Sequence, residues 1–257
     1  ARAVLAAIPL LLIVPLLIFL LIDLAPGDPA VILAGENPTP ERLDELRATL
    51  MLDQNVFVRY LDWLGGVARG DLGVSLLSDQ TVSDLLLRRM ATTLSLVVFA
   101  MVLAVIIGVV LGVLASLRPG GVLDRVINVV ASVAIAIPAF WFGLVLVSLF
   151  AVSNQIFPAF GYAPLSDGVV PWFQHLVLPG VALALLPAAE VTVQLRSALG
   201  QVMAGDYVLN AKARGLSTAS VVLKHALKNA CIPVVTVLGF RVAEVLGGAV
   251  TIEIIYS

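Results

Sequence analysis

The sequence predicts an all-α membrane protein, a bundle of several transmembrane helices with one polar region after the first span. Hydrophobic residues make up 60% of the 257 residues and charged residues only 12%, and the mean hydropathy is +1.07. Both values are far from those of an ordinary soluble domain. The apolar residues also gather in runs of roughly 20 or more, the length that crosses a bilayer core as a helix.

Five apolar runs are long enough to be transmembrane helices, and a more polar stretch separates each from the next. The first lies within residues 1–22, and the others are residues 90–117, 126–152, 176–195 and about 230–252. Gly108 and Gly112 in the second run lie one helical turn apart, a spacing that permits close packing of another helix. The sequence therefore predicts a membrane core over residues 90–257.

A long polar region, residues 23–89, separates the first two runs. It contains eleven acidic residues and six arginines, and it opens on the turn sequence Pro26-Gly27-Asp28-Pro29. Residues 41–51 are expected to form a short helix after Thr39 and Pro40, with one apolar face made of Leu43, Leu46 and Leu50. Because the region is too long for a mere connection, we expect it to pack on the membrane surface.

One polar segment, residues 200–229, contains all three lysines of the chain, Lys212, Lys224 and Lys228. Its pattern predicts two short amphipathic helices, the first with a polar ridge of Asp206, Asn210 and Arg214. Gly215 is expected to end the first helix, because glycine readily adopts positive φ. Ser217 is expected to cap the second. Such a helical pair beside a membrane can present a rigid surface to another protein.

The distribution of Lys and Arg predicts an orientation. The N-terminus, the stretch from Arg118 to Arg125 and the stretch from Arg196 to Lys228 are basic, whereas residues 153–175, expected to be a loop, contain no Lys or Arg. Short cytoplasmic loops are enriched in these residues. We therefore expect the N-terminus and the polar segment to be cytoplasmic and residues 23–89 to lie outside.

Four residues inside the apolar runs are candidates for the lining of a translocation path. Pro138 lies in the middle of the third run, where it either exposes carbonyl groups to a path or merely kinks the helix. Glu190, Arg241 and Glu244 are charges that each cost about 2.5–3.5 kcal/mol at the centre of a membrane helix. Arg241 and Glu244 are three residues apart and can pair on one helix, so a structural pair and a path lining both remain open.

Several classes of function are disfavoured. A net charge of −2 argues against a nucleic-acid partner, and the single cysteine, Cys231, excludes an internal disulfide and a cysteine metal cluster. The sequence contains no G-x-x-x-x-G-K-[ST], H-E-x-x-H or G-x-S-x-G motif. His175 and His225 fall on opposite sides of the predicted membrane and cannot share a metal. The residues therefore indicate neither an enzyme nor a cofactor or metal site in this chain.

The polar segment resembles the EAA loop of ABC-importer permeases, in the form written by the dipeptide/oligopeptide/nickel branch. That form is roughly D/E-Y-V-x-x-A-x-A-x-G-L followed by H-A-L-x-N-A-x-I-P, and the matching residues are Asp206, Tyr207, Val208, Ala211, Ala213, Gly215, Leu216, His225, Ala226, Leu227, Asn229, Ala230, Ile232 and Pro233. Further similarities cover nearly the whole chain: residues 26–29, Gly70-Asp71-Leu72-Gly73, the segment around Pro138, Gly247-Gly-Ala-Val250 and Glu253. The family continues into a sixth span beyond Ser257.

The resemblance implies the membrane-spanning subunit of an importer in a bacterial inner membrane. Its implied partners are a second homologous permease, two ATPase subunits that bind ATP and Mg, and an external substrate-binding protein, which residues 23–89 are expected to contact. It assigns contact with the ATPases to Asp206, Tyr207, Ala211, Ala213, Arg214, Gly215 and Leu216. Peptide is the expected cargo, with nickel or another small solute as the alternative. An ion-coupled secondary transporter or proton-conducting subunit is the rival class, motivated by Glu190, Arg241 and Glu244.

Overall fold

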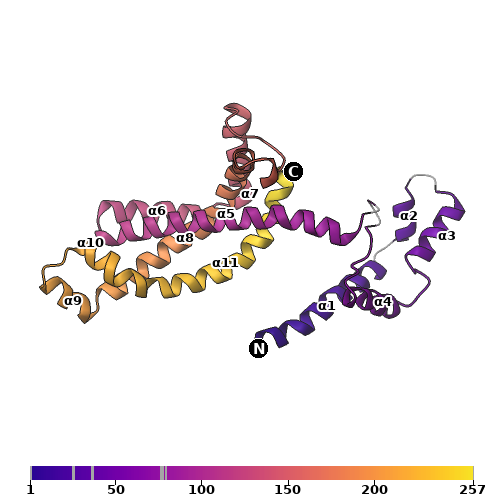
Figure 1. Cartoon of the computed structure of the whole chain (residues 1–257), viewed down its shortest axis with the longest axis horizontal. Coiled ribbons are helices and arrows are strands. Elements are labelled where there is room, and N and C mark those ends of the chain that lie inside the picture. Colours follow the sequence, from indigo (N-terminus) through magenta and orange to yellow (C-terminus); the bar gives the residue numbers. More distant parts are fainter. Residues whose placement is uncertain (1, 25–26, 36–37, 76–77, 79, 257) are drawn as a thin grey trace. The chain divides into compact units, whose positions relative to one another are not determined.

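The structure, a computed structural model, describes residues 2–24, 27–35, 38–75, 78 and 80–256. Within these ranges the regular structure is helical, apart from one isolated antiparallel bridge between Val74 and Thr81. The helices (Figure 1) are α1 (Arg2–Leu24), α2 (Pro29–Ala34), α3 (Pro40–Thr49), α4 (Val56–Ala68), α5 (Val82–Leu117), α6 (Val122–Ala136), α7 (Ala139–Leu146), α8 (Val169–Met203), α9 (Asp206–Ala213), α10 (Thr218–Val221) and α11 (Leu227–Tyr256). Short helical segments of other pitch are Val147–Ser153, Leu165–Asp167 and Val222–Ala226.

The chain divides into two compact units, Ala1–Arg89 and Met90–Ser257. In the N-terminal unit, α1 packs against α4 through aromatic side chains. The ring of Phe19 lies 5.8 Å, centroid to centroid, from those of Tyr60 and Trp63, and the Tyr60 hydroxyl donates a 2.9 Å hydrogen bond to the Leu12 carbonyl. Apolar area and an aromatic edge contact thus hold these two helices together.

Asp28 joins α2 to α3 within the N-terminal unit. Its carboxylate caps α2 by accepting from the Ala30 N–H at 2.9 Å, and it accepts from Nε and Nη2 of Arg47 at 3.0 and 2.6 Å. The Arg47 hydrogen bonds, followed by the Ala30 N–H, hold the pKa of Asp28 below its usual range. The helix expected over residues 41–51 is present as α3, which begins one residue earlier, after the Thr39 cap, and ends at Thr49.

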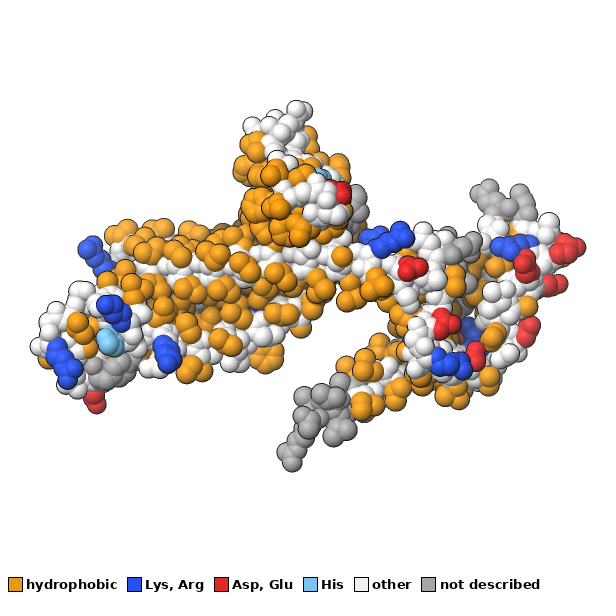
Figure 2. All heavy atoms as spheres, viewed as in Figure 1, with side chains coloured by type: hydrophobic (Ala, Val, Ile, Leu, Met, Phe, Trp, Pro, Cys, Tyr) orange, Lys and Arg blue, Asp and Glu red, His pale blue; other side chains and the backbone are white. Residues whose placement is uncertain are grey.

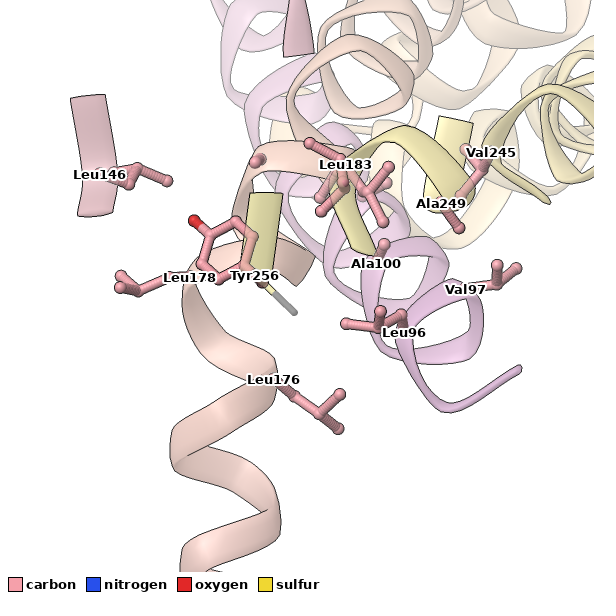
Figure 3. Packing of buried hydrophobic residues seen from close by; sticks show 14 of the residues in the cluster. Leu96, Val97, Ala100, Leu146, Leu176, Leu178, Leu183, Val245, Ala249 and Tyr256 are labelled. Carbon is pink, nitrogen blue, oxygen red and sulfur yellow. The ribbon is translucent and has the colours of Figure 1, made fainter. Parts of the chain in front are cut away.

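The C-terminal unit is built on three long helices, α5, α8 and α11. Its largest apolar cluster includes Leu176 and Leu183 from α8, Val245 and Ala249 from α11, and Ala100 from α5 (Figure 3). Of the three, α8 has the largest buried share: 67% of its most apolar stretch is buried, against 33% for α5 and 17% for the stretch Thr218–Tyr256 that contains α11. The α8 helix is therefore the central element of the unit.

Glycines allow α5 to approach α8 closely. A Cβ atom on Gly108 would lie 2.5 Å from Cγ1 of Val191, and one on Gly112 would lie 3.0 Å from Cβ of Leu195. Farther along, a Cβ on Gly180 of α8 would lie 2.2 Å from the Phe99 ring of α5. The close packing predicted from the spacing of Gly108 and Gly112 is present.

The third apolar run is not one straight helix. Helices α6 and α7 are bent by 100° at the break between Ala136 and Ala139. Pro138 disfavours helical backbone at the residue before it, and Ile137 is extended, with φ −84° and ψ 123°. The kink expected at Pro138 is therefore present, and the stretch is a broken span or a re-entrant loop. The single span over residues 126–152 stays a prediction.

Among the described residues, three helical stretches are long and apolar enough to cross a membrane: Val82–Leu117, Val169–Met203 and Thr218–Tyr256. The bent pair α6–α7 makes a fourth if it counts as one span. The predicted total of five, and the sixth span beyond Ser257, stay predictions. The loop expected over residues 153–175 is shorter than predicted, because α8 already begins at Val169.

Candidate functional site

The polar segment lies at one end of the C-terminal unit, where α9 and α10 connect α8 to α11 (Figure 1). Lys and Arg side chains gather around this end, whereas apolar side chains cover the length of the bundle (Figure 2). Helix α8 ends at Met203, and α9 begins at Asp206 with an acidic residue in its first turn. A carboxylate there is favourable, since a helix N-terminus has a partial positive charge.

Gly215 ends α9 by adopting positive φ, +82°. The Leu216 N–H donates to the Ala211 carbonyl at 3.3 Å, which is the hydrogen bond of a Schellman motif. Ser217 then accepts a 3.3 Å hydrogen bond from the Ser220 N–H and caps α10. The predicted helix–glycine–cap arrangement is therefore present.

The remaining residues predicted to contact the ATPases lie on or beside α9. Asp206, Ala213, Arg214 and Leu216 are exposed, Ala211 is half-buried, and the side chain of Tyr207 lies outside the described residues. Val208 is completely buried and fixes one face of α9. The short helix thus presents Asp206 and Arg214 to its surroundings, while Val208 faces inward.

The second helix of the polar segment is not a separate short helix. It continues from Thr218 through a π-helical turn, Val222–Ala226, directly into α11. Val222, Ala226 and Ala230 are fully buried in a cluster that also contains Leu195 and Leu199 of α8. Because burial of this face against α8 continues along the helix, which runs on through Pro233, the prediction of an independent second helix followed by a span from about residue 230 is wrong.

The structure brings together three of the four residues predicted to line a path. Arg241 on α11 forms ion pairs with Glu244 on the same helix and with Glu190 on α8. Glu190 Oε2 is buried without a hydrogen-bond partner among the described residues. We call Glu190, Arg241 and Glu244 the charge triad. Pro138 is not part of it and occupies the N-cap position of α7, at the bend.

A second interhelical ion pair was not anticipated from the sequence. Arg196 on α8 donates to Asp124 on α6 through Nε at 2.9 Å and Nη2 at 2.7 Å. Asp124 is 2% exposed. The signal that could have revealed it is the placement of one acid and one base at the ends of two apolar runs on the same side of the membrane.

A cavity of about 690 Å³ adjoins this pair at the α9 end of the unit. Its lining comes from the ends of α5 and α8, from the α5–α6 turn and from the start of α10, and includes Leu117, Pro119, Arg196, Gln201 and Thr218. Among the described residues no group of three or more His, Cys, Asp or Glu side chains could hold a metal ion.

The sequence matches the family model described as binding-protein-dependent transport system inner membrane component over residues 108–257, and the N-terminal model of the same description over residues 1–97. The chain therefore belongs to this family of membrane permeases, components of binding-protein-dependent transport systems.

Within the family the chain is similar to peptide permeases. It is 36% identical over 256 residues to a probable peptide ABC transporter permease of Sinorhizobium fredii, covering 100% of this chain and 82% of the relative. It is 37% identical over 278 residues to a di/tripeptide permease of Pseudomonas aeruginosa (100% and 83%) and 34% identical over 274 residues to the dipeptide permease of Escherichia coli K12 (97% and 81%). The resemblance to dipeptide and oligopeptide permeases is thus confirmed.

Proposed function

We propose that the chain is the transmembrane permease subunit of an ATP-driven importer of di- or oligopeptides. The observation that supports this most strongly is its similarity, at 34–37% identity over nearly its full length, to permeases of peptide transport systems. In this proposal it forms half of the translocation pathway beside a second homologous permease. Two ATPase subunits and an external substrate-binding protein complete the importer.

The chain itself is proposed to be a transport subunit rather than an enzyme. The absence of a phosphate-binding loop motif from the sequence supports placing ATP and Mg in the ATPase subunits. This chain then receives the energy of ATP binding mechanically, through its contact with those subunits.

Helix α9 and the turn at Gly215 are proposed to be that contact. Asp206 and Arg214 are exposed charges available to an ATPase groove, Ala211 and Ala213 are small enough for close approach, and Leu216 offers an apolar contact. A short helix entering a groove is a common recognition mode. Tyr207 belongs to the same proposed contact by its position in the motif.

The proposed orientation has the N-terminus and residues 200–229 in the cytoplasm of a bacterial cell and residues 23–89 outside its inner membrane. The basic side chains around α9 and α10 support it (Figure 2). Cysteines introduced at Ser78 and Ser217 test it with an impermeant thiol reagent applied to intact cells. Labelling at 78 alone is expected, and labelling at 217 alone would contradict the orientation.

The N-terminal unit is proposed to contact the binding protein. It folds as a compact unit with its own polar surface, in which Arg42, Asp44 and Glu45 are largely exposed. Deleting residues 36–52 is expected to abolish stimulation of ATP hydrolysis by the binding protein while the importer still assembles. Unchanged stimulation would indicate that the unit only covers the outer vestibule.

The charge triad and Pro138 are proposed to line the pathway. Glu244 is 57% exposed on α11, and a carboxylate facing lipid would be costly. A water-filled path or a protein partner is therefore the more favourable surrounding for this face of α11. Assembly with the second permease would place the triad in the central cavity.

Uptake by the reconstituted importer tests the function. We consider liposomes that contain this chain, its partner permease and both ATPases, with the ATPases facing the lumen. They are expected to import a labelled dipeptide only when ATP is in the lumen and the binding protein is outside. Nickel uptake that competes with the peptide would favour the alternative cargo. Uptake without ATPases that collapses with the proton gradient would instead establish the secondary transporter.

A further inference from the structure

The contacts of helix α6 with α8 include an apolar cluster and an ion pair. Toward the C-terminal end of α6, Ala131 and Ala134 pack in a small cluster with Ala189 of α8. At the α9 end, Asp124 and Arg196 form their two-pronged ion pair. Of the large side chains of α6, Val129 is 63% exposed, whereas Ile127, one turn after Asp124, is buried. The ion pair is therefore a directional contact that holds α6 at the end nearest to α9.

Asp124 connects three elements through one carboxylate. Besides Arg196 it accepts from the Gly120 N–H of the α5–α6 turn at 2.8 Å and from Nδ2 of Asn128, one turn along α6, at 2.7 Å. Four charge-assisted hydrogen bonds converge on a nearly fully buried group, and such bonds are short and directional. The turn, α6 and α8 are thus tied at a single point.

Arg196 lies close to the proposed contact with the ATPases. It precedes the end of α8, at Met203, by about two helical turns, or roughly 10 Å along the axis, and α9 begins at Asp206. The cavity beside Arg196 is also lined by Pro119 of the α5–α6 turn and by Thr218 of α10. Beside this cavity, the ion pair connects α6 directly to this end of α8.

We propose that Asp124 and Arg196 are positioning residues for energy coupling. The inference rests on the proposed function: when ATPase subunits displace α9 and the end of α8, the ion pair moves the α5–α6 turn and α6 with them. The displacement then reaches the bend at Pro138. A guanidinium fork suits this task because two parallel hydrogen bonds fix direction as well as distance.

Neutral and conservative substitutions separate this role from a merely structural one. Arg196→Gln leaves the Asp124 carboxylate buried without its ion partner, so it is expected to reduce the amount of assembled importer. The double variant Asp124→Asn/Arg196→Gln removes both charges and should recover assembly. Arg196→Lys keeps the positive charge but loses the two parallel hydrogen bonds that the guanidinium group donates to Asp124. The matched control is Arg125→Lys, at an exposed arginine next to Asp124.

The readout is peptide imported per ATP hydrolysed by the reconstituted importer. We expect this ratio to fall about tenfold in the double variant and in Arg196→Lys, a change within the usual range of coupling energies. In Arg125→Lys the ratio should stay unchanged. A wild-type ratio in every assembled variant would overturn the proposal, as would failure of all variants at the pair to assemble. Absence of ATP-driven peptide uptake by the wild-type importer, measured alongside, would instead refute the proposed function.

Discussion

Two clusters of charge lie in the C-terminal unit, and they differ in how well their charges are matched. Asp124 and Arg196 balance one another, and both carboxylate oxygens of Asp124 accept hydrogen bonds. The charge triad has two carboxylates for one guanidinium, and Glu190 Oε2 is buried without a partner among the described residues. We therefore expect the α9 end to be most sensitive to changes of geometry, and the triad to be most sensitive to changes of charge.

The most damaging change should be Gly215→Val, which alters geometry and no charge. A β-branched residue is strained at φ +82°, so the turn between α9 and α10 should deform. We expect transport to be abolished and co-purification of the ATPases to weaken, with the membrane helices still inserted. Gly200→Val is the control, because Gly200 is helical and a Cβ there would meet no atom within 4 Å. Normal transport by Gly215→Val would show that geometry at this end is not decisive.

Removing the positive charge of the triad should have the next largest effect. Arg241→Gln leaves Glu190 and Glu244 uncompensated, and we expect the importer to lose stability by about 3 kcal/mol, as when one partner of a buried pair is removed. Glu244→Gln should cost less than about 1 kcal/mol, since its side chain is exposed and Arg241 keeps Glu190.

Thermal unfolding of the purified importer and cargo uptake distinguish the two readings of the triad. Recovery of assembly when Glu244→Gln is added to Arg241→Gln would indicate a structural group. Normal assembly with altered uptake in the single variants would indicate a path lining. Equal stability and equal transport in all variants would remove both readings and with them the contrast between the clusters.

Both charge clusters include a residue of α8, and Gly180→Ala tests how tightly α8 packs against α5. The added Cβ would lie 2.2 Å from the Phe99 ring, and overpacking of this kind costs about 1–3 kcal/mol. We expect a lower unfolding temperature for the purified importer. Gly200→Ala, with open space around it, should be neutral or slightly stabilising, and a neutral Gly180→Ala would mean that α5 can move away from α8.

The smallest effect is expected at the half-buried ion pair of the N-terminal unit, Asp28 with Arg47. The folded pKa of Asp28 lies below its ordinary value of 3.8, so the pair stabilises α3 above that value and is lost as pH falls through the folded pKa. Amide exchange protection of α3 should therefore decline in acid. In Asp28→Asn the protection should be lower and should vary less with pH in this range. A wild-type pH profile in that variant would assign the decline to other groups.

The sequence alone was sufficient to predict those elements that depend only on residues close together in the chain. Long apolar runs predicted the membrane helices, Thr39 and Ser217 predicted helix starts, and Gly215 predicted the end of α9, because caps and positive φ are properties of a few consecutive residues. The motif around the same glycine also indicated the permease family, because all of its residues lie in one short continuous segment of the sequence.

The tertiary structure alone decided which distant charges meet. Asp124 and Arg196 are 72 residues apart and Glu190 and Arg241 are 51 apart, so their pairing depends on how α6, α8 and α11 pack. It likewise decided the 100° bend at Pro138 and the continuation of α10 into α11. A proline in the sequence predicts a break in a helix but not the angle of the break. A helix continues wherever burial against a neighbouring helix outweighs the weak local preference of its residues.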